Sequence, residues 1–145
     1  MDSSSKEKIK PIDENCYSEQ ELRSMFDTVG SNISIDRSVK FVGPYKRNVS
    51  FGSNIRIDAY SIISPGEIGI NLKNYIHIGP YCQLSGSGGP IRIKDFVSIS
   101  SRVSLFTASD DYSDGYMTGP MIPDHFRKIS KGKIIIGEHC IIGSG

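Results

Sequence analysis

The sequence predicts an all-β fold, a parallel β-helix with a short N-terminal helix and one long protruding loop. Three observations indicate it: large apolar residues recur every six positions over most of the chain, a segment with helical spacing precedes them, and the six-residue period stops for one long stretch. The length of 145 residues suits a single domain. We therefore expect a tail and capping helix over residues 1–30 and a β-helix over residues 31–145, with the loop at 106–133.

The helix is expected to begin after Ser18. Ser18 suits an N-cap, and Glu21 three residues later completes a capping box. Apolar residues then follow at helical spacing, and Gly30 is placed to end the helix. These apolar residues are Leu22, Met25, Phe26 and Val29. We expect them to cover the open first coil, whose strand edges would otherwise present unpaired backbone groups. A helix lying on a membrane surface is less favoured, because the polar face carries acids rather than lysines.

The six-residue period appears when the sequence is cut into blocks that begin on a large apolar residue. Such blocks are IDRSVK from Ile35, FGSNIR from Phe51, IDAYSI from Ile57, IGPYCQ from Ile78, IKDFVS from Ile93, ISSRVS from Ile99 and IGEHCI from Ile136. An inward aliphatic residue, a bend and a compact fifth residue make one flat side of a coil, and three blocks close a triangular turn. Hexapeptide periods are typical of β-helices, whereas turns in a β-sandwich recur every 8 to 12 residues or so.

Composition excludes several classes of function. The formal net charge is +1 and no long basic run occurs, which argues against a nucleic-acid partner. The first residues are polar and no long apolar run follows, so we expect a cytoplasmic protein without membrane insertion. The three cysteines have unrelated spacings that suit reduced thiols, and no histidine or cysteine cluster predicts a metal site.

Four segments carry a resemblance to a known family. They are MFDTVGSNISID after the helix, YIHIGPYCQLSGSGG in the repeat, SLFTASDDYSDGYMTGPMIP in the loop and IIIGEHCIIGSG where the repeat resumes. In this order they resemble the hexapeptide-repeat acyltransferases, particularly the galactoside and maltose O-acetyltransferases and the sugar acetyltransferases of bacterial surface polysaccharides. The resemblance implies a left-handed β-helix, a homotrimer with active sites between subunits, and acetyl-CoA as co-substrate. Family members continue for several more repeats, so we expect this chain to be a C-terminally truncated form.

The loop carries two adjacent candidate catalytic carboxylates, Asp110 and Asp111. In the resembling acetyltransferases the loop begins with a catalytic histidine, and the segment SLFTASDD places Asp110 at its position. Desolvation and the like charge of the neighbour would raise the pKa of such a carboxyl group in a partly dry cleft, which would bring it closer to the strength of a general base. The alternative is that the two aspartates cap turns or stay solvated.

Two histidines are the other candidates for proton transfer. His77, in YIHIGP, is expected to point outward toward the cleft and is the second candidate base. His125, in the loop, could reach Asp110 in its own or a neighbouring subunit, close to the acceptor. The alternative for both is an exposed polar residue without a catalytic role. His139 lies at a bend of the resumed repeat, where simple exposure is the expected explanation.

Donor binding is expected near the end of the chain. The resemblance places a backbone amide that holds the thioester carbonyl at Gly143 or Ser144, where it would stabilise the developing oxyanion. Lys131 and Lys133, in the basic segment FRKISKGK, are candidates for contacts with the phosphates of CoA. The alternative for these lysines is an ordinary solvated stretch.

Acceptor binding is expected to use tyrosines. Tyr112, Tyr116 and Tyr81 each offer a flat face and a hydroxyl group, which suits a sugar ring. Tyrosines also serve as packing residues at the roots of loops, so the alternative is a structural role.

Three functions are therefore possible. The first is an acetyl-CoA-dependent O-acetyltransferase that acts on a sugar of a surface polysaccharide such as lipopolysaccharide, O-antigen or capsule. The second is an N-acetyltransferase of an amino-sugar nucleotide; an amine needs less help from a base than a hydroxyl group does, which fits the missing histidine. The third is an inactive truncated scaffold that only trimerises.

Overall fold

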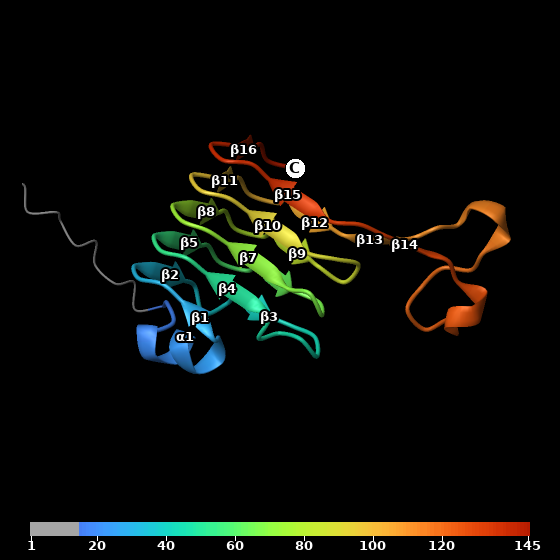
Figure 1. The fold of residues 1–145 in the computed structure, drawn as a ribbon, viewed down its shortest axis with the longest axis horizontal. Helices are drawn as coiled ribbons and strands as arrows, with labels where there is room; N and C mark the ends of the chain where they lie inside the picture. Colours follow the sequence, from blue (N-terminus) through green and yellow to red (C-terminus); the bar gives the residue numbers. More distant parts are fainter. Residues whose placement is uncertain (1–14) are drawn as a thin grey trace, which may run out of the picture.

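The computed structural model describes residues 15–145. In this range the chain forms one short helix and a stack of short strands that rise in three columns (Figure 1). The tail predicted at the start of the chain falls on residues 1–14, outside the described residues. Within the described range, no helix is long and apolar enough to cross a membrane.

The strands form three parallel sheets, which we call the first, second and third face. The first face has the order β1 (Thr28–Val29), β4 (Val49–Phe51), β7 (Ile70–Leu72), β10 (Ile91–Ile93) and β15 (Ile134–Ile136). The second has β2 (Ile33–Ile35), β5 (Ile55–Ile57), β8 (Ile76–Ile78), β11 (Ser98–Ile99) and β16 (Ile141–Ile142). The third has β3 (Lys40–Phe41), β6 (Ile62–Ser64), β9 (Gln83–Ser85) and β12 (Ser104–Phe106).

Successive strands visit the three faces in turn, so the chain is a parallel β-helix. The predicted fold class is confirmed, and the arrangement is consistent with the left-handed form. Inward residues of one coil pair with those of the next, as in the column Ile35, Ile57, Ile78 and Ile99. Each of these four side chains is buried. Burying such a side chain contributes about 1.5–3 kcal/mol, so the aliphatic columns form the main stabilising core.

Helix α1 (Glu19–Met25) has the predicted capping box. The backbone N–H of Glu21 donates to Ser18 Oγ over 3.2 Å, and the backbone N–H of Ser18 donates to Glu21 Oε2 over 2.7 Å. The helix ends earlier than predicted: Phe26 is extended, and Val29 lies in β1. The reason is packing, because the Phe26 ring lies edge-on to the rings of Phe41 and Phe51. Leu22 and Phe26 are buried in the same cluster as the coil, so α1 covers its first turn.

Several corners of the coil hold non-glycine residues in the left-handed backbone region, which is strained for them. Two corner columns carry aromatic rings that stack from coil to coil. Tyr75, Phe96 and His139 form one continuous stack with ring centroids 4.9 Å apart at each step. Tyr60 and Tyr81 form another, with centroids 5.2 Å apart. We infer that ring stacking offsets part of the backbone strain at these corners.

The loop predicted at 106–133 forms an arm, defined here as residues 108–131, that projects beyond the stack of strands (Figure 1). Its base is an antiparallel pair of β13 (Ala108–Asp110) and β14 (Ile129–Lys131), and its far part contains the 3-10 helices η1 (Ser113–Gly115) and η2 (Asp124–Phe126). Buried Thr107 anchors the base. Its Oγ1 accepts hydrogen bonds from the backbone N–H groups of Gly88 and Gly89 at 3.0 and 3.1 Å.

The buried hydroxyl group of Ser61 is a sensitive point of the core. It donates to the carbonyl of Gly79 and accepts from the backbone N–H of Cys82, both over 3.1 Å. We predict that Ser61→Ala lowers the free energy of unfolding by about 1–3 kcal/mol, because two buried backbone groups lose their partner. Chemical denaturation would measure the change. Ser104→Ala, at an exposed position on β12, serves as the control; equal stability of the two variants would contradict the prediction.

Candidate functional site

His77 lies at the centre of β8 with its side chain on the outer surface of the second face. The strands place it in an outward column with Arg56 on β5 and Ser98 on β11. Its neighbours in the strand, Ile76 and Ile78, are buried. The alternation of the strand therefore sets the outward direction of the imidazole, as the sequence predicts.

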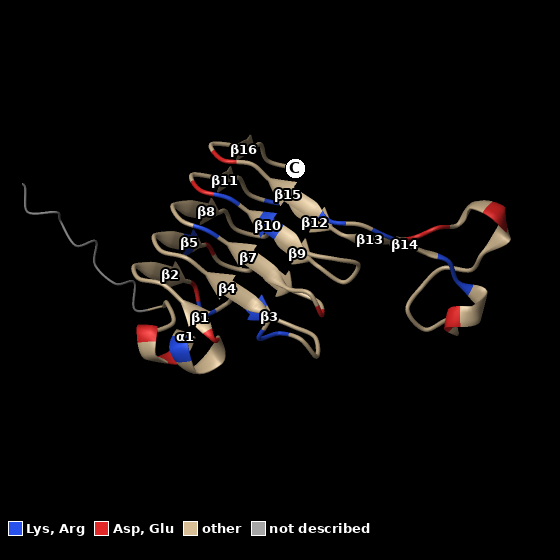
Figure 2. Cartoon of the chain, in the orientation of Figure 1, with Lys and Arg blue, Asp and Glu red and all other residues tan. Residues whose placement is uncertain are grey.

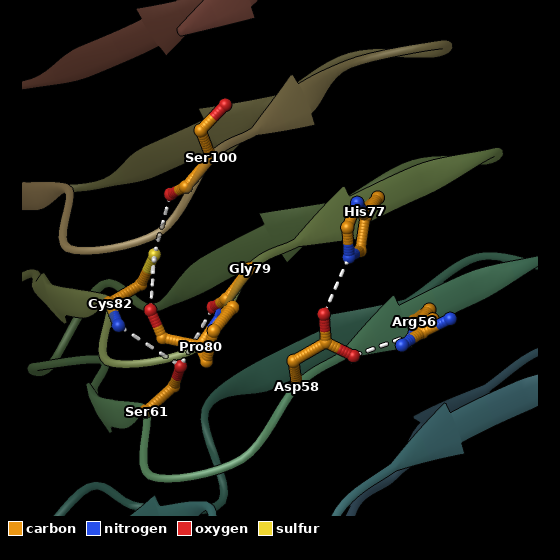
Figure 3. Close-up of polar contacts among 8 residues, drawn as sticks. All are labelled: Arg56, Asp58, Ser61, His77, Gly79, Pro80, Cys82 and Ser100. Carbon is orange, nitrogen blue, oxygen red and sulfur yellow. Dashed lines mark hydrogen bonds and ion pairs between the residues drawn. The ribbon is translucent and has the colours of Figure 1, made fainter. Parts of the chain in front are cut away.

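The structure adds Asp58, which sequence reasoning missed. Asp58 follows β5, and its Oδ2 lies 2.7 Å from His77 Nε2 (Figure 3). Its other oxygen, Oδ1, accepts a hydrogen bond from Arg56 Nε over 2.6 Å. A hydrogen on Nε2, donated to the carboxylate, leaves Nδ1 of the imidazole as a proton acceptor. The carboxylate is 18% exposed and the histidine 46%, so Asp58 can orient a ring that still faces solvent.

An open groove runs beside His77. It is lined by Asn54, Tyr75, Ile76, His77, Phe96, Val97 and Ser98. Tyr75 and Phe96 come from the stacked corner column and form an aromatic wall. The groove thus has an apolar wall on one side and an oriented imidazole on the other. This combination suits a substrate that has an apolar portion and a proton to lose.

The predicted rise in the pKa of Asp110 is wrong. The backbone N–H of Gly119 donates to Asp110 Oδ2 over 2.8 Å, and Arg127 Nη2 donates to Oδ1 over 2.7 Å. These two contacts, the Gly119 hydrogen bond first, hold the pKa of Asp110 below its ordinary value. A carboxylate that is stabilised in its charged form is a weaker base. Asp110 also lies on the arm, which projects away from the stack that carries His77 (Figure 1).

The expected effect of Asp111's like charge on Asp110 is also wrong, because the pKa of Asp110 is lowered by Gly119 and Arg127. Asp111 Oδ2 pairs with Lys128 Nζ at 2.8 Å, and Oδ1 accepts from the hydroxyl and backbone N–H of Ser113. The Lys128 contact first and then the Ser113 contact lower the pKa of Asp111 to about 2. Each aspartate thus has its own partners, and the ion pairs join the two sides of the arm.

The remaining candidates in and beside the arm are not assembled around one point. His125 lies in η2 against the ring of Phe126, with centroids 4.0 Å apart. Tyr112 is exposed, and the Tyr116 ring lies under Lys128 Nζ at 5.6 Å. Tyr81 instead lies on a corner of the coil, stacked on Tyr60.

The candidate donor residues occupy two places. Gly143 and Ser144 follow β16, and Ser144 Oγ lies 3.3 Å from Ser101 Oγ on the coil below. Lys131 ends β14, and Lys133 lies between β14 and β15; both are exposed. Contacts between these residues and CoA remain a proposal.

Known proteins resemble this chain in both sequence and structure. No protein-family model matches. The dTDP-4-amino-4,6-dideoxy-D-glucose acyltransferase of Escherichia coli is 41% identical over 128 residues, which cover 88% of this chain and 65% of that enzyme. The chain thus spans about two thirds of that relative's length.

Solved structures of AntD, an N-acyltransferase from Bacillus cereus, match as well. A mutant in complex with dTDP-4-amino-4,6-dideoxyglucose and coenzyme A has a TM-score of 0.81 and 35% identity, covering 89% of this chain and 67% of AntD. AntD in complex with dTDP and 3-hydroxybutyryl-CoA has a TM-score of 0.73 and 35% identity, covering 88% of this chain and 69% of AntD.

The ion pairs of the arm predict an acid-sensitive structure. A carboxyl group with a lowered pKa stabilises the folded arm at pH above the unfolded pKa, near 3.8, and this contribution is lost as pH falls through the folded pKa, about 2 for Asp111. We predict that the arm loosens between about pH 4 and about pH 2 while the coil stays ordered. Backbone ¹⁵N relaxation would measure this. Unchanged backbone mobility of the arm between neutral pH and about pH 2 would contradict the prediction. Unfolding of the arm and the coil over the same pH range would contradict it as well.

Proposed function

The chain belongs to the hexapeptide-repeat family of acyltransferases, and on this premise we propose that it transfers an acyl group from acyl-CoA to the amino group of a dTDP-linked amino sugar. The similarity to the Escherichia coli enzyme and to AntD, over nearly nine tenths of this chain, is the observation that carries the proposal. Acetyl-CoA is the donor that the family resemblance implies. The donor supplies the acyl group as a thioester, which needs no metal to react with an amine.

In the proposed mechanism His77 accepts a proton from the acceptor amine. An amino group is largely protonated near neutral pH and must lose a proton before, or as, its nitrogen forms the new C–N bond. His77 Nδ1 would take this proton, while the Asp58 carboxylate keeps the imidazole oriented and stabilises the positive charge that it acquires. The C–S bond breaks as the amide forms, and the nitrogen's second proton passes to the sulfur, so that CoA leaves as the free thiol. No covalent enzyme intermediate is required.

The charge state of Asp110 supports an amine acceptor over a hydroxyl acceptor. A sugar hydroxyl group needs strong assistance from a base, and the carboxylate at the expected position has a lowered pKa because Gly119 and Arg127 bind it. O-acetylation of a surface polysaccharide is therefore less well supported than N-acylation of a nucleotide-linked amino sugar. The names of the relatives agree with this order, since they specify an amino sugar and an N-acyltransferase.

We also propose that the protein acts as a cytoplasmic homotrimer. The family resemblance implies this assembly, and the arm supports it because exposed apolar side chains, including Tyr112, Met121 and Phe126, extend beyond the protein's own coil. A neighbouring subunit would cover them. The acceptor would then bind in a cleft between subunits.

The proposed acceptor is tested by comparing two nucleotide sugars that differ at one atom. We predict that dTDP-4-amino-4,6-dideoxyglucose is acylated at least tenfold faster than its 4-hydroxy counterpart, because an amine is the better nucleophile. Mass spectrometry of the product is preferable to thiol detection, since Cys140 is exposed and would react. Faster transfer to the hydroxyl compound would overturn N-acylation, and no transfer to either would favour the inactive scaffold.

The role of His77 is tested by substitution. We predict that His77→Gln lowers kcat about 100-fold, the size of a typical general-base contribution, with little change in stability because the side chain is exposed. Steady-state kinetics together with thermal unfolding would separate the two effects. His139→Gln removes the imidazole from the stacked corner column and serves as the control, with kcat expected within about twofold of wild type. Equal kcat values for the two variants would contradict the role of His77.

A further inference from the structure

A second groove lies on the first face, apart from the groove beside His77. It is bordered by β1, β4, β7 and β10 and by the segments that precede them. The lining includes Asp27, Arg47, Asn48, Ile68, Pro90 and Arg92. The groove belongs to a different sheet from His77, which lies on the second face.

Polar side chains form the floor of this groove because of the strand register. Thr28, Ser50, Asn71 and Arg92 lie on four successive strands and pair directly with one another. Their strand neighbours on β4, β7 and β10 are buried, so these side chains face outward. The floor is therefore a column of two hydroxyl groups, an amide and a guanidinium group.

The hydrogen bonds of the floor leave donors available to a ligand. Asn71 Nδ2 donates to Ser50 Oγ over 2.5 Å. Because Ser50 Oγ accepts this bond, its own hydrogen is free to be donated into the groove. Asn71 keeps a second amide hydrogen, and Thr28 contributes another hydroxyl group.

The two arginines of the groove differ in whether other residues bind them. Arg47 is held by Asp27 Oδ1 and by the carbonyl of Ser24, each over 3.1 Å. Arg92 has no hydrogen-bond or salt-bridge partner among residues 15–145. Figure 2 shows basic colour at β10, the strand that contains Arg92. The groove thus contains two guanidinium groups and one carboxylate, with Arg92 free to bind an anion.

We propose that this groove binds a phosphorylated small molecule, with Arg92 holding the phosphate and Ser50 and Asn71 completing the contacts. A planar guanidinium group donates two parallel hydrogen bonds to a phosphate, and the neighbouring hydroxyl and amide hydrogens reach the remaining oxygens. The rest of the ligand packs against the apolar wall of Ile68, which is 67% exposed, and Pro90. The assignment does not depend on the proposed acyl transfer.

Inorganic pyrophosphate tests the site without any sugar or acyl group. Titration of the 145-residue chain, followed by ¹⁵N NMR, is expected to give saturable shifts at the Arg92 Nε–H and at the backbone amides of Ser50 and Asn71. Arg92→Gln is expected to weaken this binding at least tenfold. Arg102→Gln removes the same charge from an exposed corner between β11 and β12 and is expected to leave binding within about twofold of wild type.

The outcomes distinguish specific binding at this groove from nonspecific electrostatic attraction of the anion to the protein surface. Saturable binding that Arg92→Gln weakens at least tenfold, and that Arg102→Gln leaves within about twofold of wild type, supports the proposal. Equal weakening by both substitutions, or shifts that never saturate, would overturn it. A thermal unfolding curve for each variant checks that the fold is retained, which is expected because Arg92 is exposed.

Discussion

The hydrogen-bonded register between successive coils is the constraint on which the other features depend. Each strand of the three faces pairs in parallel with the strand one coil away, so that Ile57 stands over Ile35 and under Ile78. Side chains alternate in direction along each strand, and a slip of one residue would expose the aliphatic column and bury Arg56 and His77. The cost of burying those polar groups, added to the lost apolar burial, makes the observed register strongly preferred.

The same register creates both grooves. On the second face it places Asp58 and His77 on adjacent coils, close enough for a 2.7 Å contact. On the first face it aligns Ser50, Asn71 and Arg92. The arm has a different physical basis, because Thr107 and the ion pairs of Asp110 and Asp111 order it without an aliphatic column of its own. We infer that the coil is the rigid support and that the arm is its least stable part.

The sequence predicts the coil well because the six-residue period is local and repeated. It also predicts the capping box of Ser18, because that interaction joins residues only three positions apart. It fails where distant residues meet. The charged partners of Asp110 and Asp111 lie 17 residues further on, at Arg127 and Lys128, and become visible only once the strands of the arm pair. Those strands have only three residues each, so the sequence predicts them only as part of a loop. Asp58 was recoverable, since stacking the blocks IDAYSI and IGPYCQ places it one coil from His77.

The central proposal is that this chain transfers an acyl group from acyl-CoA, and calorimetric titration with acetyl-CoA tests it most directly. Measurement on the 145-residue chain avoids any assumption about the acceptor. We predict saturable binding with a defined stoichiometry, which His77→Gln preserves because that residue is assigned to proton transfer. The absence of detectable binding heat at several temperatures would contradict the claim for this chain, even though the β-helix itself would stand.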